Sequence, residues 1–189
     1  ISGRQELASI AEFVGKIMAA KSAQSDPDFM LIARVEALIA GLGVEEALRR
    51  ADQYVEAGAD AILIHDKQPT PDAIVRFARA WRSRAPLVVV PTTFYRITIG
   101  ELEDLGIKMV IYANHGLRAA IRAMEQTYAE ILKSGTSAPV EPAIAPLSQV
   151  FELQGFPQLR QYEESFLRPG ARRIRAIIPA AGDHMQEYS

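Results

Sequence analysis

The sequence predicts an α/β protein with a parallel sheet, and two observations support that prediction. Four short, almost wholly apolar runs lie between residues 29 and 113, and continuous apolar runs are typical of strands buried on both faces. Segments with apolar residues at helical spacing alternate with these runs, as expected when parallel neighbours are joined by crossover helices. The pattern fits either a doubly wound sheet or a barrel.

The elements follow from periodicity and from the residues that end each segment. Gly58 ends one helical stripe and Pro71 opens the next helix. Strands are predicted for residues 29–34, 61–64, 86–90 and 109–113, and helices for 8–21, 44–55, 71–81, 101–105 and 117–132. In the last of these helices the predicted buried stripe is Ile121, Met124, Tyr128, Ile131 and Leu132. A proline-rich connector and two short helices, 147–154 and 157–167, come next.

Composition excludes several classes of function. The chain has 189 residues, 49% of them hydrophobic, and a net charge of −2, which predicts a globular core and no electrostatic footprint for nucleic acid or an anionic membrane. It has no cysteine, which rules out a disulfide framework and a thiol nucleophile and fits a cytoplasmic location. No apolar run approaches the roughly 18 residues of a membrane span.

Polar residues stand where the predicted strands end. In parallel α/β folds, ligands bind at the carboxyl ends of the strands, whether the sheet is open or closed into a barrel. We therefore take the polar residues at or just past those ends as candidates for a site. They are Arg34, Glu36, His65, Thr92, Asn114 and His115.

Each candidate has a functional and a structural interpretation. The guanidinium of Arg34 can hold a carboxylate or phosphonate through two parallel hydrogen bonds, or it can pair with Glu36. His65 can donate to an anion or transfer a proton, or it can be hydrogen-bonded inside the fold. Thr92 and Asn114 can place a ligand or cap the following helix. Spacing alone leaves these alternatives open.

Four stretches of sequence carry a resemblance to a known family. They are ARVEALIAG at 33–41, GADAILIH at 58–65, VPT at 90–92 and VIYANHGLRA at 110–119. Taken together, the chain from about residue 5 to 167 resembles the phosphoenolpyruvate mutase branch of the isocitrate lyase superfamily. The family has a (β/α)₈ barrel and interconverts phosphoenolpyruvate and phosphonopyruvate with Mg²⁺, in phosphonate biosynthesis.

The resemblance implies roles for matched positions only. Arg34 and His65 match the arginine and histidine that contact the transferring phosphoryl group and neighbouring oxyanions. We therefore expect both to be catalytic residues that bind a small anionic substrate, with Thr92, Asn114 and Glu36 as further substrate-binding candidates. Phosphoryl transfer through a loose transition state needs cationic and hydrogen-bonding groups around spread negative charge.

The chain also departs from the family pattern. It has four predicted strands, which align with the second half of the barrel, and a TIM barrel usually takes about 250 residues. The family's acidic Mg²⁺-organising residues and flexible loop have no match, so Mg²⁺ ligands are expected in a missing N-terminal half. Because the chain also starts on Ile1, we predict a fragment, inactive in isolation. Asp66 stands where the family more often has serine, and its role stays open.

Residues 168–189 are expected to form a linker and a truncated start of a nucleotidyltransferase domain, because 175–182 resemble the first strand and glycine turn of such domains. Rival interpretations of residues 1–167 are a phosphonopyruvate hydrolase, a carbon–carbon lyase of the superfamily and a non-catalytic remnant. The family's late helices, here about Leu147 to Leu167, pack on a neighbouring subunit, so a homo-oligomer is expected.

Overall fold

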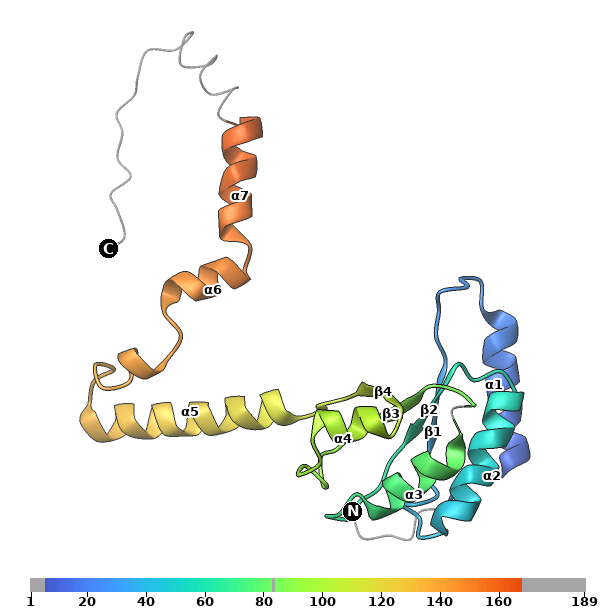
Figure 1. Ribbon diagram of the computed structural model, residues 1–189. Helices are drawn as coiled ribbons and strands as arrows, with labels where there is room; N and C mark the ends of the chain where they lie inside the picture. Colours follow the sequence, from blue (N-terminus) through green and yellow to red (C-terminus); the bar gives the residue numbers. More distant parts are fainter. Residues whose placement is uncertain (1–5, 83, 168–189) are drawn as a thin grey trace, which may run out of the picture. The chain divides into compact units, whose positions relative to one another are not determined.

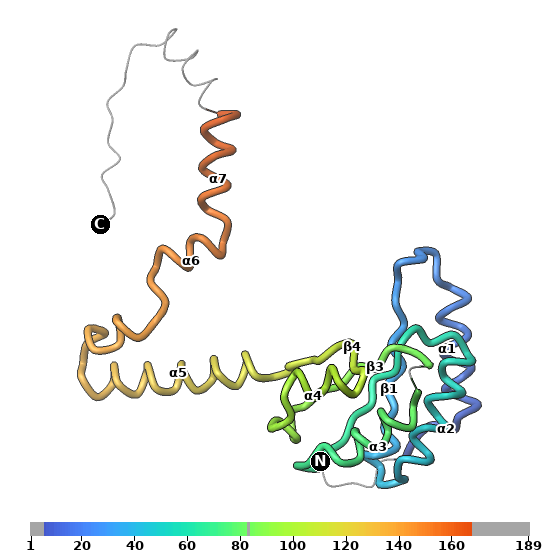
Figure 2. The backbone as a smooth tube through the Cα atoms, in the orientation of Figure 1, coloured from blue at the N-terminus to red at the C-terminus, as the bar shows by residue number. Residues whose placement is uncertain are grey.

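The structure is a computed structural model that describes residues 6–82 and 84–167. It divides into two units, the first ending at Ala120 and the second beginning at Ile121. Strands alternate with helices in the first unit, whereas the described part of the second is helical (Figures 1 and 2). The predicted linker and nucleotidyltransferase start at 168–189 lie outside the described residues.

Four βα units make up the first part of the chain, as predicted. The elements in order are α1 (Ile10–Ala23), β1 (Ile32–Val35), α2 (Gly43–Glu56), β2 (Ala61–Ile64), α3 (Asp72–Trp81), β3 (Leu87–Val89), α4 (Ile99–Asp104), β4 (Ile107–Val110) and α5 (His115–Ser134). A 3₁₀ turn (Glu141–Ala143), α6 (Leu147–Leu153), α7 (Phe156–Tyr162) and a π-helical turn (Glu163–Leu167) follow.

The four strands form one parallel sheet in the order β1-β2-β3-β4. Arg34 of β1 stands opposite Leu63 of β2, and Val35 stands opposite Ile64. Each strand is therefore hydrogen-bonded to the next one in the chain, and the carboxyl ends of all four strands share one edge of the sheet.

Helices cover one face of this sheet. Ala33 and Val35 are buried in the same apolar cluster as residues of α2 and α3, whereas 51% of the Arg34 side chain between them is exposed. In β2, Leu63 is likewise more exposed than the residues on either side of it. Parallel sheets are usually covered on both faces. Helices on one side and a second, partly exposed face that includes Arg34 and Leu63 fit the wall of a (β/α)₈ barrel, in which helices cover only the outer face of the strands.

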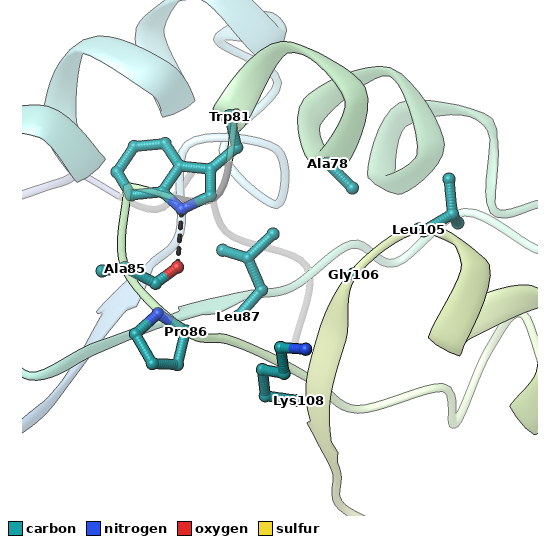
Figure 3. Close-up of a pocket in the computed structure, with 8 residues that line it drawn as sticks. All are labelled: Ala78, Trp81, Ala85, Pro86, Leu87, Leu105, Gly106 and Lys108. Carbon is teal, nitrogen blue, oxygen red and sulfur yellow. Dashed lines mark hydrogen bonds between the residues drawn. The ribbon is translucent and has the colours of Figure 1, made fainter.

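Trp81 packs near the amino ends of β3 and β4. The ring is fully buried, stacks on Phe77 at 5.7 Å between centroids, and donates its indole N–H to the carbonyl of Ala85 at 2.9 Å. Beside it is a small pocket of about 150 Å³, whose wall includes Pro86 and Lys108 (Figure 3). Trp81 is thus a packing residue, as its place in the helical pattern predicts.

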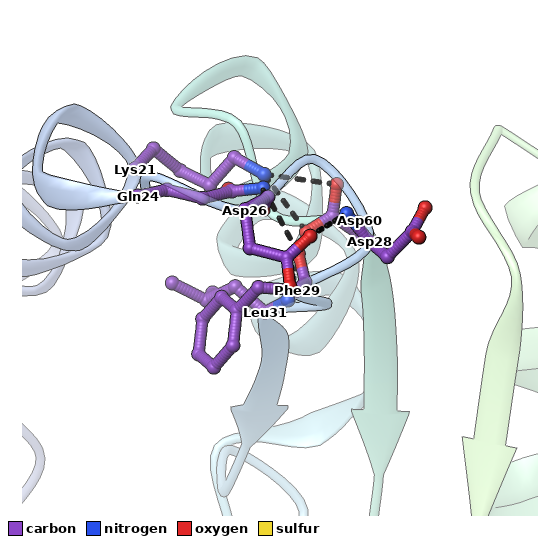
Figure 4. A network of polar contacts seen from close by, with 7 residues as sticks. All are labelled: Lys21, Gln24, Asp26, Asp28, Phe29, Leu31 and Asp60. Carbon is purple, nitrogen blue, oxygen red and sulfur yellow. Dashed lines mark hydrogen bonds and ion pairs between the residues drawn. The ribbon is translucent and has the colours of Figure 1, made fainter.

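Asp60 ties three elements together at the amino ends of β1 and β2 (Figure 4). Its carboxylate accepts the backbone N–H of Leu31 at 2.7 Å and the ammonium of Lys21, from α1, at 3.0 and 3.1 Å. The Leu31 N–H, and then Lys21, hold the pKa of Asp60 below its usual range. Because one carboxylate satisfies both partners, α1 and the start of β1 are fixed to β2.

We predict that Asp60→Ala lowers the free energy of unfolding by about 1–3 kcal/mol, since a part-buried N–H and an ammonium lose their acceptor. The carboxylate's contribution is present above the unfolded-state pKa of about 3.9 and is lost as the pH falls through the lower folded-state value. Urea unfolding of the 189-residue chain at pH 7 and pH 3 measures both effects.

Glu12→Ala is the matched control, because Glu12 makes an exposed pair with Lys16 on α1 and such pairs are worth no more than about 0.5 kcal/mol. Equal unfolding midpoints for the two variants would contradict a structural role for Asp60.

Two expectations about strand boundaries are corrected. Phe29 and Met30, predicted inside a buried strand, precede β1 and are 57% and 54% exposed. β4 runs from Ile107 to Val110, so it begins two residues earlier and ends three residues earlier than the predicted strand. Apolar runs mark where a strand lies, but pairing with the neighbouring strand decides where it begins and ends.

The predicted burial of the α5 stripe is wrong. No residue of α5 is buried, and the stripe residues Met124, Tyr128 and Leu132 are 50%, 68% and 87% exposed. Helical periodicity shows that one face is apolar, whereas burial also needs a surface packed against that face.

In the described part of the chain, no helix is long and apolar enough to cross a membrane.

Candidate active site

Strand pairing gathers the predicted site residues at the carboxyl edge of the sheet. Arg34 lies in β1 and Glu36 directly follows that strand, while His65 directly follows β2. The last paired residues are Val35 and Ile64. One step further along both strands, Glu36 and His65 therefore come next to each other, within reach of the long side chain of Arg34.

Arg34, Glu36 and His65 form one hydrogen-bonded group. The Nε of Arg34 donates to Oε1 of Glu36, and its Nη2 lies 3.4 Å from Nδ1 of His65. Both interpretations of Arg34 that the sequence left open can thus hold together, because an arginine has five N–H donors and these two contacts use two of them. The remaining donors are available to an anion.

The contact with Arg34 indicates the tautomer of His65. A guanidinium has donors only, so Nδ1 of His65 must accept, which places the proton of the neutral ring on Nε2. Burial and, after it, the positive charge of Arg34 lower the pKa of His65, while Glu36 and Asp66 act in the opposite direction. At neutral pH, His65 is therefore an uncharged group with an Nε2–H to donate.

Arg34 and Glu36 also line an open groove of about 570 Å³. Its lining also includes Phe13 and Tyr54, whose ring centroids lie 4.5 Å apart. The groove has both a cation and an apolar wall.

Thr92 and Asn114 stand at the ends of the next two strands. The backbone N–H of Thr92 donates to the carbonyl of Val90 at 2.8 Å, and the carbonyl of Asn114 accepts from Arg118 N–H at 2.9 Å as α5 begins. Neither is hydrogen-bonded to the Arg34 group. Oδ1 of Asn114 and Nδ1 of His115 are buried without a partner within the described structure. The oxygen of Asn114 can accept a hydrogen bond from a further group, and Nδ1 of His115 can accept or donate one according to its tautomer.

Asp66, whose role the sequence left open, and Thr93, which the sequence did not single out, are structural parts of the site. The Asp66 carboxylate turns onto its own loop, where Oδ1 accepts the N–H of Lys67 at 2.7 Å. The hydroxyl of Thr93 donates to the Asp66 carbonyl at 3.1 Å. An aspartate followed by polar residues directly after a strand is a signal for such a side-chain turn. The sequence does not show that this turn is hydrogen-bonded to the segment after β3.

Within residues 6–82 and 84–167, no group of three or more acidic or histidine side chains is placed to hold a metal ion. The described residues therefore do not by themselves fit Mg²⁺, which prefers several carboxylate and water oxygens in octahedral geometry. The candidate site consists of a cation, a neutral imidazole donor and neighbouring hydroxyl and amide groups.

Fold and site together define a class: an α/β protein of the TIM-barrel type with a guanidinium, a carboxylate and an imidazole in contact at the carboxyl ends of its strands. A family model described as phosphoenolpyruvate phosphomutase matches residues 2–132. The chain belongs to the phosphoenolpyruvate mutase family, as the sequence resemblance implied.

Two curated relatives are about equally similar to the chain. A phosphoenolpyruvate phosphomutase of Tetrahymena pyriformis is 47% identical over 87% of this chain and 55% of its own length. A phosphonopyruvate hydrolase of Variovorax sp. (strain Pal2) is 48% identical over 88% of this chain and 58% of its own length.

Solved structures show the same likeness. A phosphoenolpyruvate phosphomutase from Streptomyces platensis subsp. rosaceus is 54% identical with a TM-score of 0.86, covering 88% of this chain and 58% of that one. A phosphonopyruvate hydrolase in complex with oxalate and Mg²⁺ is 47% identical with a TM-score of 0.83, covering 88% and 59%. The predicted fold class is confirmed, and the chain spans 55–59% of the length of these four proteins.

The charges around His65 predict that two substitutions shift its pKa in opposite directions. Arg34→Gln removes a positive charge and raises the pKa of His65, whereas Glu36→Gln removes a negative charge and lowers it. Titration of the His65 ring by NMR in the 189-residue chain measures both. Arg49→Gln, which removes an exposed arginine paired with Glu46 on α2, is the control. Shifts of the same sign in the first two variants would contradict the described geometry.

Proposed function

We propose that this chain forms the substrate-anion side of an isomerase that interconverts phosphoenolpyruvate and 3-phosphonopyruvate. The proposal rests on the contact between Arg34 and His65 at the carboxyl edge of the sheet. It also rests on the membership of this chain in the phosphoenolpyruvate mutase family. The contact places two chemically different donors, a guanidinium and a neutral imidazole N–H, side by side. Such a pair suits a phosphoryl group that carries several negatively charged oxygens.

The proposed reaction moves a phosphoryl group within one molecule. The bond from phosphorus to the C2 enol oxygen of phosphoenolpyruvate breaks and a bond from phosphorus to C3 forms, so no atom is gained or lost. Negative charge is spread over the phosphoryl oxygens between these two bonds. In our proposal Arg34 and the Nε2–H of His65 bind those oxygens throughout, and Glu36 orients the guanidinium. Thr92 and Asn114 line the site on the side of β3 and β4.

Mg²⁺ is part of the proposal, because a similar phosphonopyruvate hydrolase has been solved with Mg²⁺ and oxalate. When bound, the ion would neutralise charge on the substrate oxygens. Since the described residues offer no cluster of acids for it, we propose that its ligands come from a part of the protein outside this chain. The contribution of this chain in our proposal is that Arg34 and His65 bind and orient the substrate.

A phosphonopyruvate hydrolase is the second candidate, because the Variovorax hydrolase is as similar to this chain as the Tetrahymena mutase. Two observations favour the mutase. In our interpretation, the stretches TTFY at 92–95 and MVIYAN at 109–114 resemble mutase sequences slightly more than hydrolase sequences. Among the solved structures, the Streptomyces mutase is 54% identical and the hydrolase complex 47%.

Phosphorus NMR distinguishes the two reactions. With phosphonopyruvate and Mg²⁺, the complete protein that contains this chain is expected to produce a phosphoenolpyruvate signal, whereas a hydrolase would release inorganic phosphate and pyruvate. The isolated 189-residue chain is expected to produce neither. Phosphate as the first product would overturn the mutase proposal.

Arg34→Lys in the complete protein provides the internal test of the site. Lysine keeps the positive charge but loses the planar fork and the donor to His65, so kcat/KM is expected to fall about 10²-fold or more. Arg49→Lys, on the surface of α2, is the matched control and is expected to keep full activity.

We also propose that the protein is a homo-oligomer. Three of the described helices that follow the sheet, α5, α6 and α7, carry large exposed apolar side chains, and large exposed apolar patches mark interaction sites. Examples are Tyr128 and Leu132 of α5, Leu147 and Leu153 of α6, and Leu159 of α7.

Sedimentation velocity of the 189-residue chain is expected to show a species larger than a monomer. Leu132→Lys, at 87% exposure on α5, is expected to weaken the association, because a charge would be buried in the contact. A wild-type chain that sediments as a monomer with a single cooperative unfolding transition would contradict this proposal.

A further inference from the structure

Asp66 is a nearly fully buried carboxylate that the proposed reaction does not use. Only 2% of the residue is exposed, although it directly follows His65. Burying a carboxylate is costly unless its oxygens find donors. Oδ1 accepts two of them, the backbone N–H groups of Lys67 at 2.7 Å and Gln68 at 3.3 Å. The carboxylate therefore folds the chain after β2 into a closed turn.

A hydrogen bond ties this turn to the segment that follows β3. The hydroxyl of Thr93 donates to the carbonyl of Asp66 at 3.1 Å. Thr93 stands between Thr92, a candidate substrate-binding residue, and Phe94, whose side chain is fully buried. Since Phe94 anchors the segment after β3 in the core, the bond from Thr93 gives the turn after β2 a rigid neighbour.

The orientation of the Asp66 carboxylate also limits its repulsion of an anionic substrate. A carboxylate pointing toward a phosphonate would repel it. Here the carboxylate is bonded to the N–H groups of its own loop, so its charge is partly balanced there. The charged groups that act on His65 are Arg34 and Glu36 from β1 and its end, and Asp66 from the loop itself.

We propose that Asp66 is a positioning residue, whose carboxylate-closed turn and bond from Thr93 hold His65 at the end of β2 in contact with Arg34. The part that His65 plays toward the substrate rests on the proposed function. The placement of His65 rests on the contacts alone and can be tested without substrate.

A comparison of two uncharged variants isolates the role of the hydrogen-bond acceptor. Asp66→Asn keeps an oxygen that can accept both N–H groups, whereas Asp66→Ala keeps none, and both lose the negative charge. We expect the ring of His65, titrated by NMR in the 189-residue chain without substrate, to have a higher pKa in D66A than in D66N. Once the turn opens, His65 loses its burial and its contact with Arg34, the two causes that lower its pKa.

Thr93 provides a second comparison that leaves every charge in place. Thr93→Val removes the hydroxyl and is expected to raise the pKa of His65, whereas Thr93→Ser keeps it and is expected to match the wild type. Asp26→Ala is the matched control, because Asp26 accepts the N–H of Asp28 at 2.9 Å in a similar turn before β1. It is expected to leave the His65 titration unchanged.

Equal His65 pKa values in D66A and D66N would overturn the proposal, because the acceptor would then have no effect on His65. If D66A does not fold, a T93V titration curve identical to that of T93S would overturn it instead. Neither result depends on the reaction that the complete protein catalyses. A failure of the mutase proposal in the phosphorus NMR assay is therefore distinguishable from a failure of this one.

Discussion

Parallel pairing of β1 with β2 is the constraint on which the site depends. The register that sets Val35 opposite Ile64 also brings Glu36 and His65 together one step later, and only then can Arg34 reach both. Side chains alternate between the two faces of a sheet, so a slip by one residue would turn Arg34 toward the helices and bury its charge. The buried apolar cluster that includes Ala33 and Val35 therefore favours the observed register, and this register places the site residues.

The amino edge of the sheet contributes to stability, whereas the carboxyl edge carries the candidate site. At the amino edge, the carboxylate of Asp60 accepts hydrogen bonds from the Leu31 N–H and from Lys21, and so joins protein segments to one another. The carboxyl edge keeps donors and acceptors that the protein does not fully use, such as the remaining N–H groups of Arg34 and the Oδ1 of Asn114. This is the usual division of a (β/α)₈ fold, in which the carboxyl edge carries function and the opposite edge carries stability.

Sequence reasoning identified the features that local patterns determine. Apolar runs located the four strands, and the polar residues at their ends located Arg34 and His65, because a parallel sheet brings those ends to one edge. The features it missed depend on contacts between distant segments. The bond from Thr93 to Asp66 joins residues 27 apart in the chain, and the exposure of Met124 and Leu132 depends on which surface meets α5. Periodicity contains neither kind of information.

The site combines a guanidinium with a nearby carboxylate, although its proposed ligand is an anion. Glu36 occupies the Nε donor of Arg34 and so offsets part of the attraction for the ligand. It also fixes the plane of the guanidinium, which leaves the remaining N–H groups aimed in set directions. In a reaction that moves a phosphoryl group between two positions, uniformly tight binding does not lower the barrier. A moderated but well-oriented cation is therefore better suited to the shared transition state than a free arginine would be.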